Sequence, residues 1–100
     1  MIKVKFEYKN NKIIGFKVSG HANYDDYGKD IVCASVSSIV ITSINLMISI
    51  DSNSISYVDA DGLINCKVLK ENEIINKVIL NMKDMLEQLE KEYKKNVKIL

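Results

Sequence analysis

The feature that most constrains this chain is a run of twenty residues, from Ile31 to Ile50, without a single charged side chain. A run of this length could cross a bilayer as a helix. Seven of its residues are polar, however, which makes insertion into lipid unfavourable: Ser35, Ser37, Ser38, Thr42, Ser43, Asn45 and Ser49. We therefore expect a buried helix in a soluble domain, with the serines at close backbone contacts.

A strand pattern precedes this predicted helix. Apolar and charged side chains alternate over residues 2–9, and apolar side chains recur at every second position over residues 14–18, as in half-buried strands. Asn10 and Asn11 lie between the two runs, and asparagine tolerates the positive φ angles of a tight turn. These patterns predict a β-hairpin that ends at Ser19.

The second half of the chain repeats this order. Short strands are predicted around residues 55–58 and 64–68, with an Asp-Gly turn signal between them. From residue 75 to residue 93, apolar side chains recur at spacings of three and four, which indicates an amphipathic helix. Alternation over residues 97–99 predicts a last short strand.

The predicted elements follow the order ββαββαβ, which most naturally forms a mostly antiparallel sheet with two helices. One hundred residues provide one hydrophobic core and not two. We therefore expect a single two-layer α+β domain over residues 1–100, without an internal linker.

The composition limits the chemistry. All fourteen basic residues are lysines, and thirteen acidic residues leave a net charge of +1, which argues against nucleic-acid binding. One histidine and two cysteines cannot fill an ordinary four-ligand zinc site or build a disulfide framework, so we expect no metal and no cofactor. The N-terminus alternates instead of running apolar, so no secretory signal is predicted. Free thiols then indicate the cytoplasm.

Cys33 lies three residues after Asp30, which is a good N-cap for the predicted helix. The first turn of a helix has unsatisfied N–H groups and favours negative charge, so a thiolate is stabilised there. The same amides could hold the oxyanion of a tetrahedral intermediate. Cys33 is thus a candidate nucleophile. The alternative, from position alone, is a small apolar residue buried in the helix.

His21 is the only histidine, so any imidazole chemistry must use it. It lies in a polar stretch, residues 20–29, that includes Gly20 and Gly28 and shows no period, which predicts a loop. This loop leads into the helix with Cys33 and can fold back to bring imidazole to thiol, giving a nucleophile with a general base and acid. The alternative is a surface histidine without a task.

Other side chains near this pair could support it. Asp25, Asp26 and Asp30 offer carboxylates that could orient the imidazole, although Asp30 has an equally good role as helix cap. Ser37 lies one turn beyond Cys33 and could hydrogen-bond within the site. A small residue at a packing contact is the other interpretation of Ser37.

The residues around this pair resemble a known family. The chain has GHA at residues 20–22, GKDIVCA at residues 28–34 and VS at residues 36–37. This pattern resembles the ribosomal-processing cysteine protease family, Prp, and the resemblance covers the whole chain in length and element order. One departure is Ser35, where alanine is common in the family.

The resemblance implies a cytoplasmic bacterial cysteine endopeptidase, dimeric in known relatives. The family removes a short N-terminal extension from the large-subunit ribosomal protein L twenty-seven and cuts after an aromatic residue. Carried over by motif, Cys33 is the nucleophile and His21 is the base. The supporting residues are Asp30, Ser37, Gly20 and Gly28, of which the glycines would let the loop move aside for a peptide.

The partners follow from the same argument. The substrate tail of a ribosomal protein is expected to be basic, so we predict that Asp25 and Asp26 help to hold it. No nucleic-acid or membrane partner is expected. The uncharged helix over residues 31–50 is too apolar to face water, and one small sheet does not cover all of it, which predicts an isologous homodimer.

Two other functions fit these residues. A non-enzymatic module that docks on a ribosomal protein or an assembly factor would keep the fold and a groove, but it would need no reactive thiol. A thiol redox sensor fits less well, because Cys66 lies among apolar residues of a different element. Nothing marks Cys66 as a resolving partner for Cys33, and we interpret it as a core residue.

Overall fold

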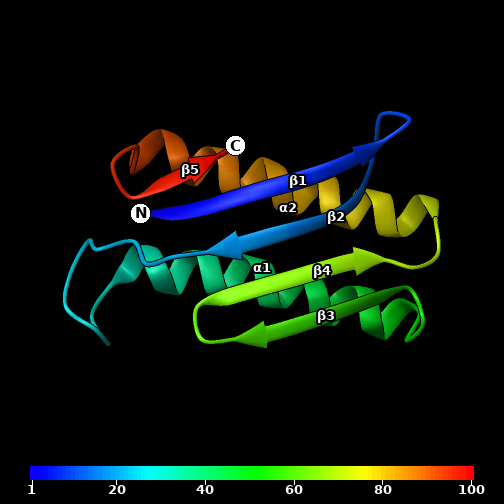
Figure 1. Cartoon of the computed structure of the whole chain (residues 1–100), viewed down its shortest axis with the longest axis horizontal. Coiled ribbons are helices and arrows are strands. Elements are labelled where there is room, and N and C mark those ends of the chain that lie inside the picture. The colour runs from blue at the N-terminus through cyan, green and yellow to red at the C-terminus, as the bar shows by residue number, and fades with distance from the viewer.

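The computed structural model describes residues 1–100, and its elements follow the expected order ββαββαβ (Figure 1). The strands of the first half are β1 (Ile2–Lys9) and β2 (Lys12–Ser19), followed by helix α1 (Ile31–Ile50). The second half consists of β3 (Ile55–Ala60), β4 (Leu63–Val68), α2 (Glu73–Glu92) and β5 (Val97–Ile99). The α+β fold class is therefore confirmed.

The five strands form one sheet in the order β3-β4-β2-β1-β5. All neighbours are antiparallel except β1 and β5, which run parallel and bring the two ends of the chain together. Asn10 and Asn11 have φ angles of 51° and 64°, so the first hairpin turn uses the two residues that the sequence singles out. Asp61 and Gly62 turn the second hairpin with φ angles of 45° and 77°.

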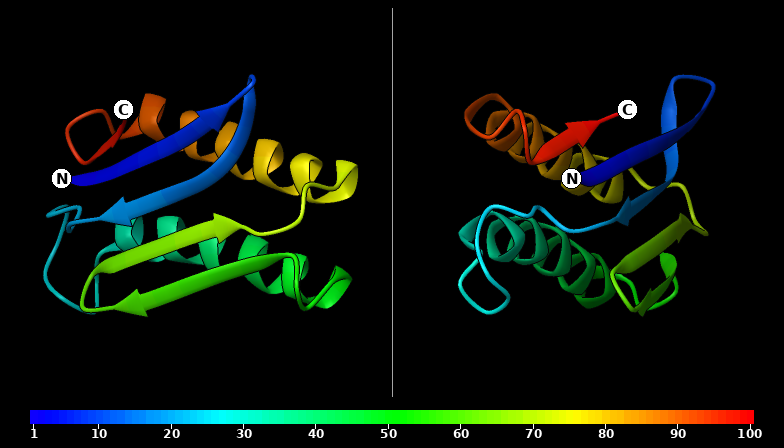
Figure 2. Two further views of the ribbon diagram at one scale, coloured as in Figure 1. Left: turned by 45° about the vertical axis from the view of Figure 1, so that its right-hand side comes forward. Right: turned by 60° about the vertical axis from the view of Figure 1, so that its left-hand side comes forward.

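Both helices pack on one face of the sheet, which gives two layers (Figure 2). The side chains of β1 show why: Ile2, Val4 and Phe6 are buried, whereas the alternating Lys3 and Lys5 are exposed on the other face. The core therefore lies between the sheet and the helices, and the outer face of the sheet is uncovered.

Helix α1 is long and apolar enough to span a membrane, but one of its faces lies in the core. The buried residues are Val32, Val36, Val40, Ser43, Ile44 and Met47. The opposite face keeps Ile31 and Leu46 about half exposed. The expectation of a buried helix is thus correct for one face only. Of the serines in this helix, only Ser43 is buried, and its hydroxyl donates to the carbonyl oxygen of Ile39.

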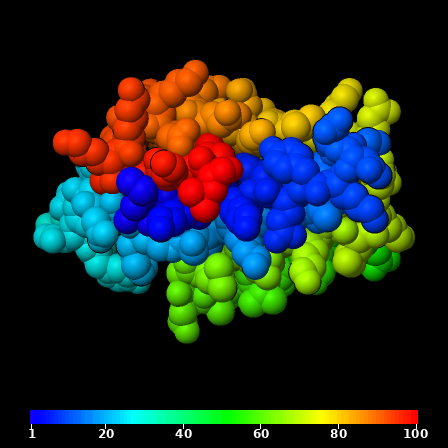
Figure 3. Space-filling view, turned by 45° about the horizontal axis from the view of Figure 1, so that its top comes forward, coloured from blue at the N-terminus to red at the C-terminus, as the bar shows by residue number.

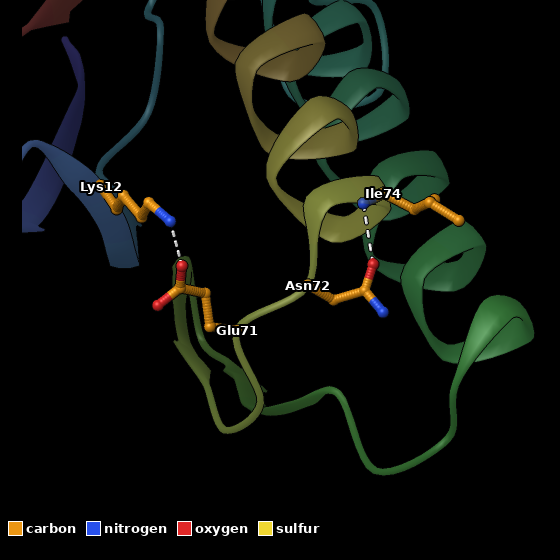
Figure 4. A network of polar contacts seen from close by, with 4 residues as sticks. All are labelled: Lys12, Glu71, Asn72 and Ile74. Atoms are coloured by element: carbon orange, nitrogen blue, oxygen red, sulfur yellow. Dashed lines mark hydrogen bonds and ion pairs between the residues drawn. The ribbon is translucent and has the colours of Figure 1, made fainter.

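Helix α2 begins with a cap of its own. The Asn72 side chain accepts a hydrogen bond from the N–H of Ile74 across 2.7 Å, and the preceding Glu71 forms an ion pair with Lys12 of β2 (Figure 4). Ile75, Ile79, Met82 and Leu86 are the buried positions of this helix, spaced by three and four residues as the sequence predicts.

Candidate active site

Asp30 caps α1 and at the same time holds the loop that precedes it. Its Oδ1 accepts hydrogen bonds from the N–H groups of Val32 (3.0 Å) and Cys33 (2.9 Å). Its Oδ2 accepts from Tyr24 (2.9 Å) and Asp25 (3.3 Å). Desolvation alone would raise the pKa of Asp30, but these four N–H donors outweigh it and hold the pKa below its usual value.

The first turn of α1 does not offer the oxyanion donors expected from the sequence. The N–H groups of Val32 and Cys33 are bound by the carboxylate of Asp30, and the N–H of Ala34 donates to the carbonyl oxygen of Asp30 across 3.1 Å. The expectation is wrong for these amides, because the capping residue already satisfies them.

Cys33 is half-buried, and its sulfur receives a hydrogen bond from the loop. The N–H of Ala22 donates to Sγ of Cys33 across 3.3 Å. Ala22 is only 2% exposed, so this donor is fixed in the protein interior directly after His21. Cys33 also packs against the hydrophobic core as a partly buried residue, so the alternative interpretation as a small apolar packing residue fits this position as well.

His21 lies against the turn between β3 and β4. A Cβ placed on Gly62 would lie 3.6 Å from both Cε1 and Nε2 of His21, so the imidazole packs directly on the backbone of this turn. The N–H of Gly20 donates to the carbonyl oxygen of Gly62 across 3.2 Å, which fixes the start of the loop on the same turn. His21 itself is exposed.

No hydrogen bond or ion pair joins His21 to Asp25, Asp26 or Asp30 in this structure. Both oxygens of Asp30 face backbone donors, and Oδ1 of Asp25 accepts from the N–H of Asp26 across 2.7 Å. A carboxylate partner for His21 from this set therefore stays a prediction. What fixes the segment is backbone contact with the β3–β4 turn.

Asn96 is a contact of this loop that sequence reasoning missed. Its side-chain Nδ2 donates to the carbonyl oxygen of Ala22 across 2.9 Å, although the two residues are 74 positions apart. The carbonyl oxygen of Asn96 in turn accepts from the N–H of Ile2 across 2.8 Å. Tyr24 adds a second tie, because its ring meets Tyr93 edge-on with centroids 5.4 Å apart. The C-terminal turn therefore clamps the loop that carries His21.

His21 and Cys33 line the same cleft, which has a volume of about 720 Å³. Seven of the eight site residues singled out in the sequence line it: Gly20, His21, Asp25, Gly28, Asp30, Cys33 and Ser37. Asp26 is the exception, because its side chain is not part of the lining. The cleft is bounded by α1 on one side and by the β3–β4 hairpin on the other.

The carboxylates that line the cleft give it a negative charge. Asp25, Asp30 and Asp59 line it, and none of the fourteen lysines does. Asp59 comes from β3, opposite Ile64 of β4, and sequence reasoning missed it. No local signal marks this residue, because only the tertiary packing of the hairpin against the loop brings it to the cleft.

Cys66 lies in the core and takes no part in the site. It is 1% exposed, and burial raises the pKa of its thiol to about 11. Both cysteines are free. An inert Cys66 gives Cys33 no resolving partner, which is the argument against a redox sensor.

Comparison with known proteins shows which family the chain belongs to. Residues 1–98 match the family described as cysteine protease Prp. The chain belongs to this family. It is a cysteine-type endopeptidase, which excludes the non-enzymatic binding module considered from the sequence.

Relatives of known sequence agree with this family. The chain is 32% identical, over 91 residues, to the ribosomal processing cysteine protease Prp of Staphylococcus aureus, a match that covers 88% of this chain and 86% of the relative. It is 24% identical to the Prp of Bacillus subtilis over 99% of this chain and 96% of the relative.

Solved structures agree as well. A crystal structure of S. aureus Prp with a covalently linked product peptide superposes with a TM-score of 0.90 at 29% identity, covering 99% of this chain and 97% of that one. A crystal structure of S. aureus Prp with a substrate peptide superposes with a TM-score of 0.88 at 26% identity, covering 100% of this chain and 98% of that one.

Proposed function

We propose that this protein removes the N-terminal extension of the large-subunit ribosomal protein L twenty-seven in the cytoplasm, cutting after an aromatic residue. Cys33 is the nucleophile, and His21 is the general base and acid. The observation that carries the proposal is the placement of both side chains in one cleft, with the N–H of Ala22 directed at the sulfur.

The reaction uses two steps. Sγ of Cys33 attacks the scissile carbonyl carbon, while His21 takes the thiol proton and passes it to the nitrogen of the leaving amine. The C–N bond breaks, and the extension remains on Cys33 as a thioester. A water molecule then attacks the thioester carbonyl and gives its proton to His21, and the extension leaves with a free carboxylate as the thiol of Cys33 is restored.

The lining of the cleft supports cleavage beside a large apolar residue. Ile2, Val18, Ile41 and Ile64 contribute apolar walls around the reacting pair. An aromatic ring that enters such a pocket buries a large area of apolar surface. The acidic side chains at the rim favour positive charge on the adjoining peptide.

The substrate assignment is tested with the extended ribosomal protein and the purified enzyme. Mass spectrometry is expected to find two products, the short extension ending in an aromatic residue and the mature protein. Replacing that aromatic residue of the substrate by alanine is expected to decrease kcat/KM at least tenfold, whereas replacing it by a different aromatic residue has little effect. Equal cleavage of all three substrates would contradict the proposed specificity.

We also propose that two copies pair through α1. The exposed side of this helix carries no charge, and with α2 it forms a groove of about 610 Å³ whose apolar lining includes Ile31, Met85 and Leu89. A second copy would cover this surface through an isologous contact. Sedimentation is expected to find a dimer that Leu46→Glu dissociates, while Leu80→Glu, on the outer side of α2, leaves it intact. A wild-type protein that stays monomeric at about 100 µM would contradict this.

A further inference from the structure

The face of the sheet opposite the helices carries five exposed lysines, which we call the lysine face: Lys3 and Lys5 of β1, Lys17 of β2, Lys67 of β4 and Lys98 of β5. Neither helix covers this face (Figure 2), and in Figure 3 the atoms of β1, in blue, and of β5, in red, lie at the surface beside α2. The lysines therefore spread over four neighbouring strands of the sheet, β4, β2, β1 and β5.

The strand register places these charges next to one another. Lys5 lies directly opposite Lys17 across the β1–β2 pair, and Lys3 lies beside Lys98 across the β1–β5 pair. Like charges at directly opposed positions destabilise a sheet. Repulsion between these neighbouring lysines therefore opposes folding.

No ion pair with a carboxylate neutralises the positive charge of the lysine face. The single ion pair of the molecule joins Lys12 to Glu71, so none of the five lysines is paired. Glu7 is the only acidic residue at an outward position of the five strands. Three aspartates instead line the active-site cleft on the helix side of the sheet. The net charge of +1 therefore conceals a basic face and an acidic cleft.

We propose that the lysine face binds the phosphate backbone of double-helical RNA. The proposal departs, for this face, from the expectation of no nucleic-acid partner, which rested on the near-neutral net charge and the absence of arginine. A broad array of ammonium groups on a rigid surface complements a polyanion whose charges also spread over two dimensions. Such contacts position the nucleic acid without reading its bases.

The side chains between the lysines favour RNA duplex over other polyanions. No aromatic residue occupies an outward position near them, so the stacking platform of a single-strand binder is missing. No helix or ribbon projects from this face to enter the major groove of DNA. A-form RNA presents a wide, shallow minor groove with phosphates and 2′-hydroxyls, which an open sheet face can contact. Asn65, opposite Lys17 across the β2–β4 pair, and Ser19, opposite Lys3 across the β1–β2 pair, supply hydrogen-bond partners for the hydroxyls.

Fluorescence anisotropy with a labelled RNA hairpin of about 16 base pairs tests this with the full chain. Wild-type protein is expected to bind with a Kd on the order of 10 µM at low salt. The variant Lys5→Gln/Lys17→Gln/Lys67→Gln is expected to bind at least tenfold more weakly. Its slope of log K against log salt is expected to decrease by about 3, roughly one per lost phosphate contact.

A matched variant separates the effect of the lysine face from the effect of the total charge of the protein. Lys77→Gln/Lys91→Gln/Lys94→Gln removes three exposed lysines from α2 and the turn after it, and it is expected to keep the affinity of the wild type within about twofold. Both variants are expected to cleave peptide at the wild-type rate, because the lysines lie outside the cleft. The variant Lys5→Gln/Lys17→Gln/Lys67→Gln is expected to be at least as stable to unfolding as the wild type, because it relieves the repulsion between Lys5 and Lys17.

Three outcomes would overturn the proposal. The first is no binding of RNA by the wild type, and the second is an equal loss of affinity in the two variants. The third is equal or tighter binding of a DNA duplex or of polyglutamate, which would assign the face to another polyanion.

Discussion

The N–H of Ala22 points at the sulfur of Cys33 across 3.3 Å, so the residue that follows His21 supplies a donor to the proposed nucleophile. The carbonyl oxygen of the same alanine is held by Nδ2 of Asn96 across 2.9 Å. Loop, helix and C-terminal turn therefore meet at one buried backbone position. We therefore expect Asn96 to act as a positioning residue, since it contacts Ala22 and not the sulfur of Cys33.

Asn96→Ala is expected to decrease kcat/KM about fivefold, because one hydrogen bond contributes about 1 kcal/mol. Alkylation of Cys33 by iodoacetamide is expected to slow in the same variant, since the Ala22 donor is no longer fixed. Asn81→Ala, which changes an exposed asparagine of α2, is the matched control and is expected to alter neither rate. Unchanged alkylation and cleavage in Asn96→Ala would mean that the Ala22 contact needs no support from Asn96.

Asp30→Asn is expected to unfold at a lower temperature at pH 7, because an amide cannot accept from all four N–H groups that Asp30 binds. The pKa of Asp30 is lowered in the folded protein, so its stabilising contribution is complete above the unfolded pKa of about 3.9 and is lost as the pH falls through the lowered value. Urea unfolding at pH 7 and pH 2.5 checks this. A difference between wild type and variant that is as large at pH 2.5 as at pH 7 would contradict it.

The two cysteines are expected to differ sharply in reactivity. Native protein treated with iodoacetamide at pH 8 is expected to carry one label, on Cys33, whereas protein in guanidinium carries two. Burial raises the pKa of the Cys66 thiol from 9.0 to about 11, so its stabilising contribution is present below pH 9.0 and is lost as the pH rises through 11. Cys66→Val is expected to remove that part of the alkaline destabilisation. Labelling of Cys66 in the native protein would refute its assignment to the core.

Much of the fold could be predicted because its signals are local. Alternation defines β1 and β2, the spacing of apolar residues defines α2, and Asp30 is a cap that can be recognised from its position before an uncharged run. The exposed side of α1 could not be predicted in this way, because local patterns do not indicate how much of an apolar helix the sheet will cover.

The contacts that complete the site depend on tertiary structure and carry no local signal. Asn96 reaches Ala22 from the far end of the chain, and Asp59 reaches the cleft through the pairing of β3 with β4. The second function of Asp30, as acceptor for Tyr24 and Asp25, likewise depends on how the loop folds back on α1. The roles of His21 and Cys33 in cleavage stay a prediction until activity is measured.

The acidic side chains of the cleft are expected to control affinity for a basic peptide. Asp25→Asn/Asp59→Asn is expected to raise KM about tenfold on a substrate with lysines beside the scissile bond, with little change in kcat, because each exposed charge pair contributes up to about 1 kcal/mol. The effect is expected to shrink in high salt. Asp26→Asn is the matched control, since Asp26 does not line the cleft. An equal rise of KM in Asp26→Asn would assign the effect to general charge.

The most direct test of the central claim is the mass of the enzyme during turnover. Rapid acid quenching, digestion and mass spectrometry are expected to find the extension bound as a thioester to the fragment that contains Cys33. Cys33→Ala is expected to show neither thioester nor cleavage, Cys66→Val to show both, and His21→Ala to lose at least a thousandfold in rate. A thioester on another residue, or cleavage by Cys33→Ala at the wild-type rate, would contradict the account.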